Sequence, residues 1–117
     1  MVNQIAISAG MLAVSEAMLY AKKAGLDPKT VLKSIEAGAA GSWTLSNLAP
    51  RMLDENFEPG FFIKHFIKDM TIAKENSEKM DLNTPGLDLS IELYKKAAKQ
   101  GYDEKGTQAI YDFLRKF

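Results

Sequence analysis

The segment FFIKHFIKDMTIAKE, residues 61–75, places charged and aromatic side chains on one side of a predicted helix. At about 100° per residue, Phe61, His65, Lys68 and Ile72 form a strip, with Asp69 on its flank. A lysine offers a positive donor and an aspartate an acceptor, and adjacent helical residues point into neighbouring sectors. Spacing alone favours a solvated pair, and the alternative is a site where each residue reaches a different ligand.

Two neighbouring amides, Asn3 and Gln4, open the first predicted helix. Buried amides need hydrogen-bond partners, so these two either bond a neighbouring domain or belong to a site. The single histidine, His65, is more often a surface or packing residue than a catalytic one, and without cysteine it cannot complete a typical zinc site. No catalytic-triad spacing, GxGxxG or P-loop is present, so any nucleotide must find most of its site elsewhere.

The composition predicts one soluble domain with a substantial core. The chain has 117 residues, of which 46% are apolar and 26% charged. Fifteen basic side chains balance fifteen acidic ones, which argues against a general nucleic-acid binder. The apolar stretch at residues 5–14 is too short to span a bilayer, and no basic segment precedes it as in a signal peptide. We therefore expect a cytoplasmic protein without membrane or nucleic-acid contacts.

Helical periodicity and capping signals follow the whole chain and predict an all-α domain of five to seven helices. Asp27, Ser42 and Thr107 are the predicted caps, and Thr84-Pro85 is predicted to start the fifth helix. Pro50 is predicted to kink or divide the third helix. The predicted helices run from Asn3 to Lys23, from Pro28 to Gly38, from Ser42 through Leu53, from residue 61 to about residue 79, from Thr84 to Gly101, and from Thr107 onward. The predicted core side chains of the last five are Val31, Leu32, Ile35, Trp43, Leu45, Leu48, Met52, Leu53, Phe62, Ile63, Phe66, Ile67, Met70, Ala73, Leu87, Ile91, Tyr94, Ala98, Ile110, Phe113 and Leu114.

The first helix is long, and its first half is apolar or small nearly all round. Such a helix is expected to be buried on several sides. Ala6, Ala9, Gly10 and Ala13 would let another backbone approach closely. We infer a partner domain or subunit around this helix. Because the chain opens directly into it without a lead-in loop, we expect a piece of a longer protein.

The stretch AKKAGLDPKTVLKSIEAG, residues 21–38, has the outline of a helix-turn-helix. In that interpretation Lys29, Thr30 and Lys33 would face DNA. Two packed helices joined by a capped turn explain the stretch better, because the local charge is too weak for several phosphate contacts.

Taken together, these segments resemble the C-terminal domain of the β-hydroxyacid dehydrogenases, which has a 6-phosphogluconate dehydrogenase-like fold. MVNQIAISAGMLAVSEAMLYAKKAGLDP is similar to the long helix that opens that domain, and FFIKHFIKDMTIA is similar to its F-x-x-x-x-x-x-KD-[LM]-x-[LI]-A segment. SWTLSNLAPRML and GTQAI also fit. The likeness covers essentially all 117 residues, and the KD segment together with VNQ is its specific part.

The resemblance implies that residues 1–117 are a substrate-side and dimerisation domain, while a separate N-terminal Rossmann domain holds NAD or NADP. It implies hydride transfer between nicotinamide and a small β-hydroxyacid or semialdehyde, in a homo-oligomer formed through the first helix. The family includes 3-hydroxyisobutyrate dehydrogenase, tartronate semialdehyde reductase and glyoxylate/succinic semialdehyde reductase. The alternative is a standalone helical dimerisation or binding module with no catalysis.

The resemblance also implies roles for single residues. Asn3 and Gln4 match the K-x-x-N-[NQ] catalytic motif, where they would orient substrate and the catalytic lysine. That lysine would lie immediately before Met1, so we expect this chain to be inactive alone. Phe61 and Asp69 match substrate-cleft positions and Lys68 a cofactor-contacting lysine. The resemblance implies no role for His65 and no metal site.

Overall fold

The computed structural model describes all 117 residues and contains six α-helices and no strand. This confirms the predicted all-α domain with a long first helix. The helices are α1 (Val2–Lys23), α2 (Pro28–Ile35), α3 (Trp43–Leu53), α4 (Ile63–Lys79), α5 (Pro85–Ala97) and α6 (Ile110–Arg115). A π-helical turn (Ala98–Tyr102) follows α5, and a 3-10 turn (Thr107–Ala109) leads into α6.

Two of the three predicted side-chain caps are confirmed. The Asp27 carboxylate accepts hydrogen bonds from the Lys29 backbone N–H and from the Thr30 hydroxyl, at the start of α2. The Ser42 hydroxyl accepts a hydrogen bond from the Leu45 N–H at 2.9 Å, at the start of α3. The prediction is wrong for Thr107. Thr107 begins the 3-10 turn, and its side chain makes no capping hydrogen bond. Thr84-Pro85 starts α5 as predicted, with Thr84 at the N-cap position.

The ends of α2 and α3 differ from the prediction. The second helix ends at Ile35, not at Gly38, because the following turn folds back over the Glu36 carbonyl. A side chain at Gly41 would lie only 2.4 Å from that carbonyl oxygen, so the turn requires glycine there. Pro50 lies inside α3 without dividing it, and the Pro50 carbonyl still accepts a helical hydrogen bond from the Asp54 N–H at 3.0 Å.

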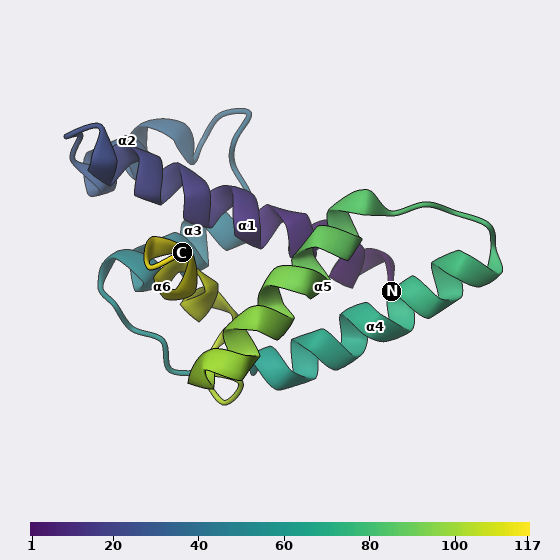
Figure 1. The fold of residues 1–117 in the computed structure, drawn as a ribbon. Coiled ribbons are helices and arrows are strands. Elements are labelled where there is room, and N and C mark those ends of the chain that lie inside the picture. The colour runs from purple at the N-terminus through teal and green to yellow at the C-terminus, as the bar shows by residue number, and fades with distance from the viewer.

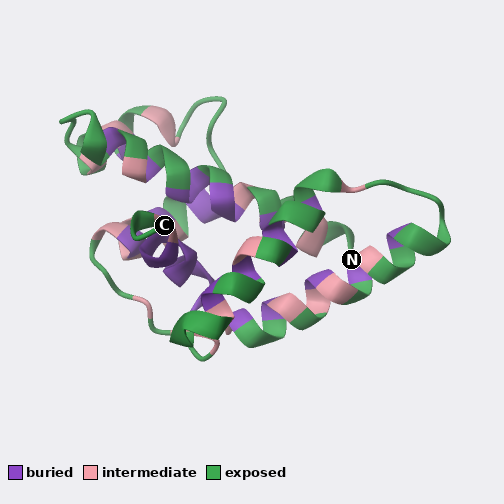
Figure 2. Ribbon diagram, viewed as in Figure 1, coloured by how far each residue is buried: buried purple, intermediate pink, exposed green.

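The helix α1 crosses the molecule and packs against α3, α4, α5 and α6. The helices α4 and α5 form a hairpin on one side, and the N-terminus lies beside α4 (Figure 1). The segment 106–113, which includes the start of α6, is buried throughout (Figure 2). This short central segment therefore links the α4–α5 hairpin to α1 and α3.

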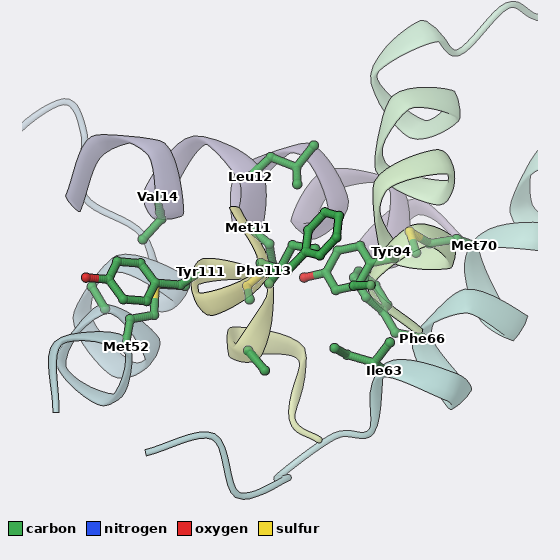
Figure 3. Packing of buried hydrophobic residues seen from close by; sticks show 14 of the residues in the cluster. Met11, Leu12, Val14, Met52, Ile63, Phe66, Met70, Tyr94, Tyr111 and Phe113 are labelled. Carbon is green, nitrogen blue, oxygen red and sulfur yellow. The ribbon is translucent and has the colours of Figure 1, made fainter. Parts of the chain in front are cut away.

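The predicted core faces are largely confirmed (Figure 3). The rings of Phe66 on α4 and Tyr94 on α5 pack edge to face with centroids 5.1 Å apart, a favourable geometry for aromatic pairs. The core cluster consists of Met11, Leu12, Val14, Met18, Leu32, Leu45, Ala49, Met52, Ile63, Phe66, Met70, Ala73, Leu87, Ile91, Tyr94, Ala97, Ala109, Ile110, Tyr111 and Phe113. The predicted core residues that are only half-buried are Val31, Ile35, Leu48, Leu53, Phe62, Ile67, Ala98 and Leu114.

The outer face of α1 is not covered within this chain. Ala6, Ala9, Ala13 and Ala17 are exposed. The 117 residues of this chain therefore do not bury α1 on several sides as expected. The whole helix also has the length and composition of a membrane span, although the stretch 5–14 alone does not, and about a third of it is buried. Core helices of soluble proteins and N-terminal signal sequences pass the same test of length and hydropathy, and α1 supplies four of the 20 residues of the core cluster.

The Tyr111 hydroxyl is buried and has no hydrogen-bond partner. A buried polar group without a partner destabilises the folded state by about 1–3 kcal/mol. We therefore expect Tyr111→Phe to raise the free energy of unfolding of this chain by about 1 kcal/mol, measured by urea denaturation.

Tyr94→Phe is the matched control, because the Tyr94 hydroxyl donates a hydrogen bond to the Thr107 carbonyl at 2.9 Å. That variant should lose about 1 kcal/mol of stability. Equal losses in the two variants would contradict our account of Tyr111.

Candidate functional site

A chain of side-chain hydrogen bonds joins the start of α1 to the middle of α4. The Asn3 amide N–H donates to Gln4 Oε1 at 2.7 Å. Gln4 Nε2 donates in turn to Asp69 Oδ2 at 3.0 Å, across 65 positions of sequence. The structure thus brings together the two motifs that the sequence predicted separately, the amide pair and the Lys-Asp pair.

The packing of α1 against α4 explains this contact. Gln4 and Asp69 are half-buried between the two helices, while Asn3 is exposed at the rim. The Asn3 side-chain oxygen and the second Asp69 oxygen have no partner within the chain. Both are therefore available to accept hydrogen bonds from a hydroxyl-bearing ligand.

Phe61 lies in the same region but not on the helix. The prediction that α4 includes Phe61 is wrong, because Phe62 forms a β-bridge with Gly106 and the helix begins at Ile63. The Phe61 carbonyl accepts a hydrogen bond from the Thr107 N–H at 2.9 Å, which holds this residue extended. Its side chain is 38% exposed.

The Phe61 ring still lies beside the predicted strip. Its centroid is 6.5 Å from that of His65 and 6.0 Å from that of Phe66. The His65 ring also packs edge to face against Phe62, with centroids 5.5 Å apart, and the His65 side chain makes no hydrogen bond. His65 is thus a packing residue between two phenylalanine rings. No group of three His, Asp or Glu side chains could hold a metal ion.

Lys68 is an unpaired cation next to Asp69. Two other lysines of α4 are paired: Lys64 donates to Glu104 at 2.8 Å, a hydrogen bond that raises the pKa of Lys64 and lowers the pKa of Glu104. Lys74 pairs with Asp88 at 2.6 Å. Lys68 is exposed and has no carboxylate within 4.0 Å. Its charge is therefore free to meet an anionic ligand.

A small cavity of about 180 Å³ lies next to Phe61. It is enclosed by α1, α3, the turn before α4 and the 3-10 turn, and its lining includes Trp43, Arg51 and Gln108. Trp43 was predicted to be a core residue, which is wrong, because it is 69% exposed at the start of α3. A second, open groove of about 600 Å³ starts at Asn3 and follows the small residues of α1 toward residues 40–44.

The residues at this site fit one edge of a nicotinamide cofactor site. Lys68 supplies a free cation, and Asn3 supplies an amide oxygen and an N–H group beside it. A glycine-rich turn of the kind that cradles a pyrophosphate is absent from the chain. The pyrophosphate of a dinucleotide therefore has no such cradle within these 117 residues.

Comparison with known proteins identifies the family. Residues 1–114 match the family model described as the NAD-binding domain of NADP-dependent 3-hydroxyisobutyrate dehydrogenase. The chain belongs to this family. This confirms the resemblance to the β-hydroxyacid dehydrogenases, and the family's description supports NAD or NADP as the cofactor.

Individual relatives agree with this assignment. The chain is 65% identical over 111 residues to an uncharacterized oxidoreductase, YkwC, of Bacillus subtilis, covering 95% of this chain and 38% of that protein. It is 35% identical over 112 residues to 2-hydroxy-3-oxopropionate reductase of Escherichia coli, covering 96% of this chain and 38% of that protein. This dehydrogenase-family chain thus spans about two-fifths of the length of these relatives.

The fold also matches a solved member of the family. The crystal structure of 3-hydroxyisobutyrate dehydrogenase from Salmonella typhimurium superposes with a TM-score of 0.89 and 20% identity, covering 96% of this chain and 39% of that chain. At this identity the likeness establishes the helical fold and does not assign a substrate.

Proposed function

We propose that this chain is the substrate-side domain of an NAD(P)-dependent 3-hydroxyisobutyrate dehydrogenase-like enzyme, which acts on a small β-hydroxyacid or semialdehyde. The observation that supports this most strongly is the hydrogen bond from Gln4 to Asp69. It places the amide pair of one family motif against the Lys-Asp pair of another. In a helical module without a ligand, this contact would serve only to join α1 to α4.

Each residue then has a defined task. Asn3 uses its free amide oxygen to orient the substrate hydroxyl and the catalytic lysine of the complete enzyme, while Gln4 is held in place by Asp69. Phe61 forms an apolar wall that keeps water from the reacting carbon. Lys68 offers positive charge to the cofactor. When bound, the nicotinamide supplies or accepts the hydride.

The uncovered face of α1 fits the remaining partners. Its exposed alanines permit close helix packing, and the groove of about 600 Å³ along them begins at Asn3. We propose that the Rossmann domain and a second subunit cover this face in a cytoplasmic homo-oligomer. Sedimentation of the complete enzyme should then give at least a dimer, which Ala9→Arg should dissociate.

Steady-state assays of the complete enzyme and of residues 1–117 test this function. The complete enzyme should reduce a small semialdehyde with NADH or NADPH, whereas the isolated chain should not. Reduction by the isolated chain would contradict the expected absence of the catalytic lysine and the nucleotide site. A complete protein that binds no dinucleotide would favour the standalone helical module.

Lys68 is expected to serve the cofactor more than the substrate. Hydrogen bonds to charged groups contribute about 1.5–3 kcal/mol, so Lys68→Ala in the complete enzyme should raise the KM for NAD(P)H about tenfold or more. The KM for the semialdehyde should change much less. Lys79→Ala is the matched control, because Lys79 is also exposed and unpaired but lies at the far end of α4. Equal cofactor KM values in the two variants would remove Lys68 from the site.

A further inference from the structure

The segment that carries Phe61 has little regular structure of its own. Residues 54–62 connect α3 to α4 and form only the single bridge between Phe62 and Gly106. Loops without such structure depend on side chains to satisfy their backbone carbonyls and to fix their path. The position of Phe61 therefore depends on what holds this loop.

Gln108 holds the loop through one buried amide. Its side chain is 1% exposed, and its Nε2 donates to the carbonyls of Asn56 at 3.0 Å and Glu58 at 2.9 Å. Both hydrogens of the amide group are thus used on two carbonyls that lie shortly before Phe61. A second side chain, Arg51, donates from Nη2 to the same Glu58 carbonyl at 2.6 Å.

The backbone around Gln108 is built to aim this amide. A Cβ at position 106 would lie 2.4 Å from Gln108 Oε1, so any residue larger than glycine there would displace the amide. The Gly106 N–H donates to the Phe57 carbonyl at 2.8 Å, and the Thr107 N–H donates to the Phe61 carbonyl at 2.9 Å. The GTQ sequence therefore contacts the loop at residues 56–58 and again at Phe61.

The same turn is anchored on its other side to the helical core. The buried Tyr94 hydroxyl of α5 donates to the Thr107 carbonyl at 2.9 Å. Gln108 also lines the cavity of about 180 Å³, together with Phe61 and Arg51. Consecutive hydrogen bonds thus connect α5 to the GTQ turn and the GTQ turn to Phe61, at the candidate substrate site.

We propose that Gln108 is a positioning residue for substrate: its buried amide fixes the 54–62 loop and thereby sets the Phe61 ring in the substrate cleft. The inference rests on the proposed role of Phe61. A buried amide is costly unless all its hydrogen bonds are made, and an apolar side chain of similar size would fill the same space without that requirement. The polar residue is explained by the geometry that it imposes on the loop.

Kinetics of the complete enzyme test the proposal through Gln108→Leu, which keeps the volume and removes both donors. Misplacement of a positioning group by about 1 Å can reduce activity by up to about 100-fold. We expect kcat/KM for the semialdehyde to fall at least about tenfold while the KM for NAD(P)H is unchanged. In a Phe61→Ala background, Gln108→Leu should have little further effect, because both changes remove the same wall.

Leu32→Ala is the control for stability alone, because Leu32 is buried on α2, outside both the GTQ turn and the 54–62 loop. It should lower the melting temperature without changing the semialdehyde kinetics. The proposal is overturned if Gln108→Leu behaves like this control, or if its effect adds fully to that of Phe61→Ala.

A crystal structure of the Gln108→Leu enzyme separates this proposal from the proposed function. We expect the 54–62 loop and the Phe61 ring to be displaced. An unchanged Phe61 would overturn the role of Gln108 even in an active dehydrogenase. Failure of the wild-type enzyme to reduce any semialdehyde would instead refute the reaction, and with it the role of Gln108 toward substrate.

Discussion

In the complete enzyme, Asp69→Ala should lower kcat/KM for a small semialdehyde by about 100-fold. The change removes the acceptor of the Gln4 Nε2 hydrogen bond and leaves the Gln4 amide free to rotate. Because Asn3 donates to Gln4, loss of this anchor also frees the residue proposed to orient the substrate. Steady-state kinetics with varied semialdehyde and saturating NAD(P)H measure the effect.

Two further variants define the cause of this loss. Asp69→Asn keeps a side-chain oxygen that can accept from Gln4, so it should retain more activity than Asp69→Ala. Glu75→Gln removes a carboxylate from an exposed position of the same helix and should leave the kinetics unchanged. If Asp69→Ala matched Glu75→Gln, the Lys-Asp pair would be a solvated pair of the helix surface.

Phe66→Ala should destabilise the chain by about 3–5 kcal/mol, the usual range for removing a buried phenylalanine. Phe66 is completely buried and packs against Tyr94 of α5, so the substitution leaves a cavity between α4 and α5. Urea denaturation of residues 1–117, followed by circular dichroism, measures the change. A loss of this size is a large part of the stability of a typical domain.

Phe61→Ala is the matched control, because the two rings are neighbours that differ in burial. Phe61 is partly exposed, and its loss should cost about 1 kcal/mol or less in stability. It should instead lower semialdehyde turnover in the complete enzyme. A larger loss of stability for Phe61→Ala than for Phe66→Ala would contradict the assignment of one ring to the core and the other to the site.

Local signals were sufficient to predict most of the helices. Asp27 and Ser42 cap their helices as predicted. Each side chain accepts a hydrogen bond from a backbone N–H only two or three residues later, so the interaction depends on local sequence alone. Phe66, Met70 and Tyr94 are buried as predicted because helical periodicity fixes which residues share a face. The predicted helix start at Phe61 was wrong because of the bridge between Phe62 and Gly106. The predicted helix end at Gly38 was wrong because of the tight turn after Glu36. Neither contact can be predicted from hydrophobic periodicity.

The candidate site was only partly predictable. The resemblance to the β-hydroxyacid dehydrogenases indicated Asn3, Gln4 and Asp69, but their hydrogen bonds depend on how α1 packs on α4. Gln108 carried a weak signal, the glycine two positions before it. A buried amide is unexpected on the inner side of a helix, and its carbonyl partners lie about 50 positions away in sequence. Contacts between residues so far apart in sequence produce no hydrophobic periodicity from which they could be predicted.

The central claim is that Gln4 and Asp69 act as one unit at a substrate site. A double-mutant cycle on kcat/KM for the semialdehyde, with Gln4→Ala, Asp69→Ala and the double variant of the complete enzyme, tests it most directly. We predict that the double variant is no worse than the more damaged single variant, because either change breaks the same hydrogen bond. Fully additive losses, or no loss in any of the three variants, would contradict it.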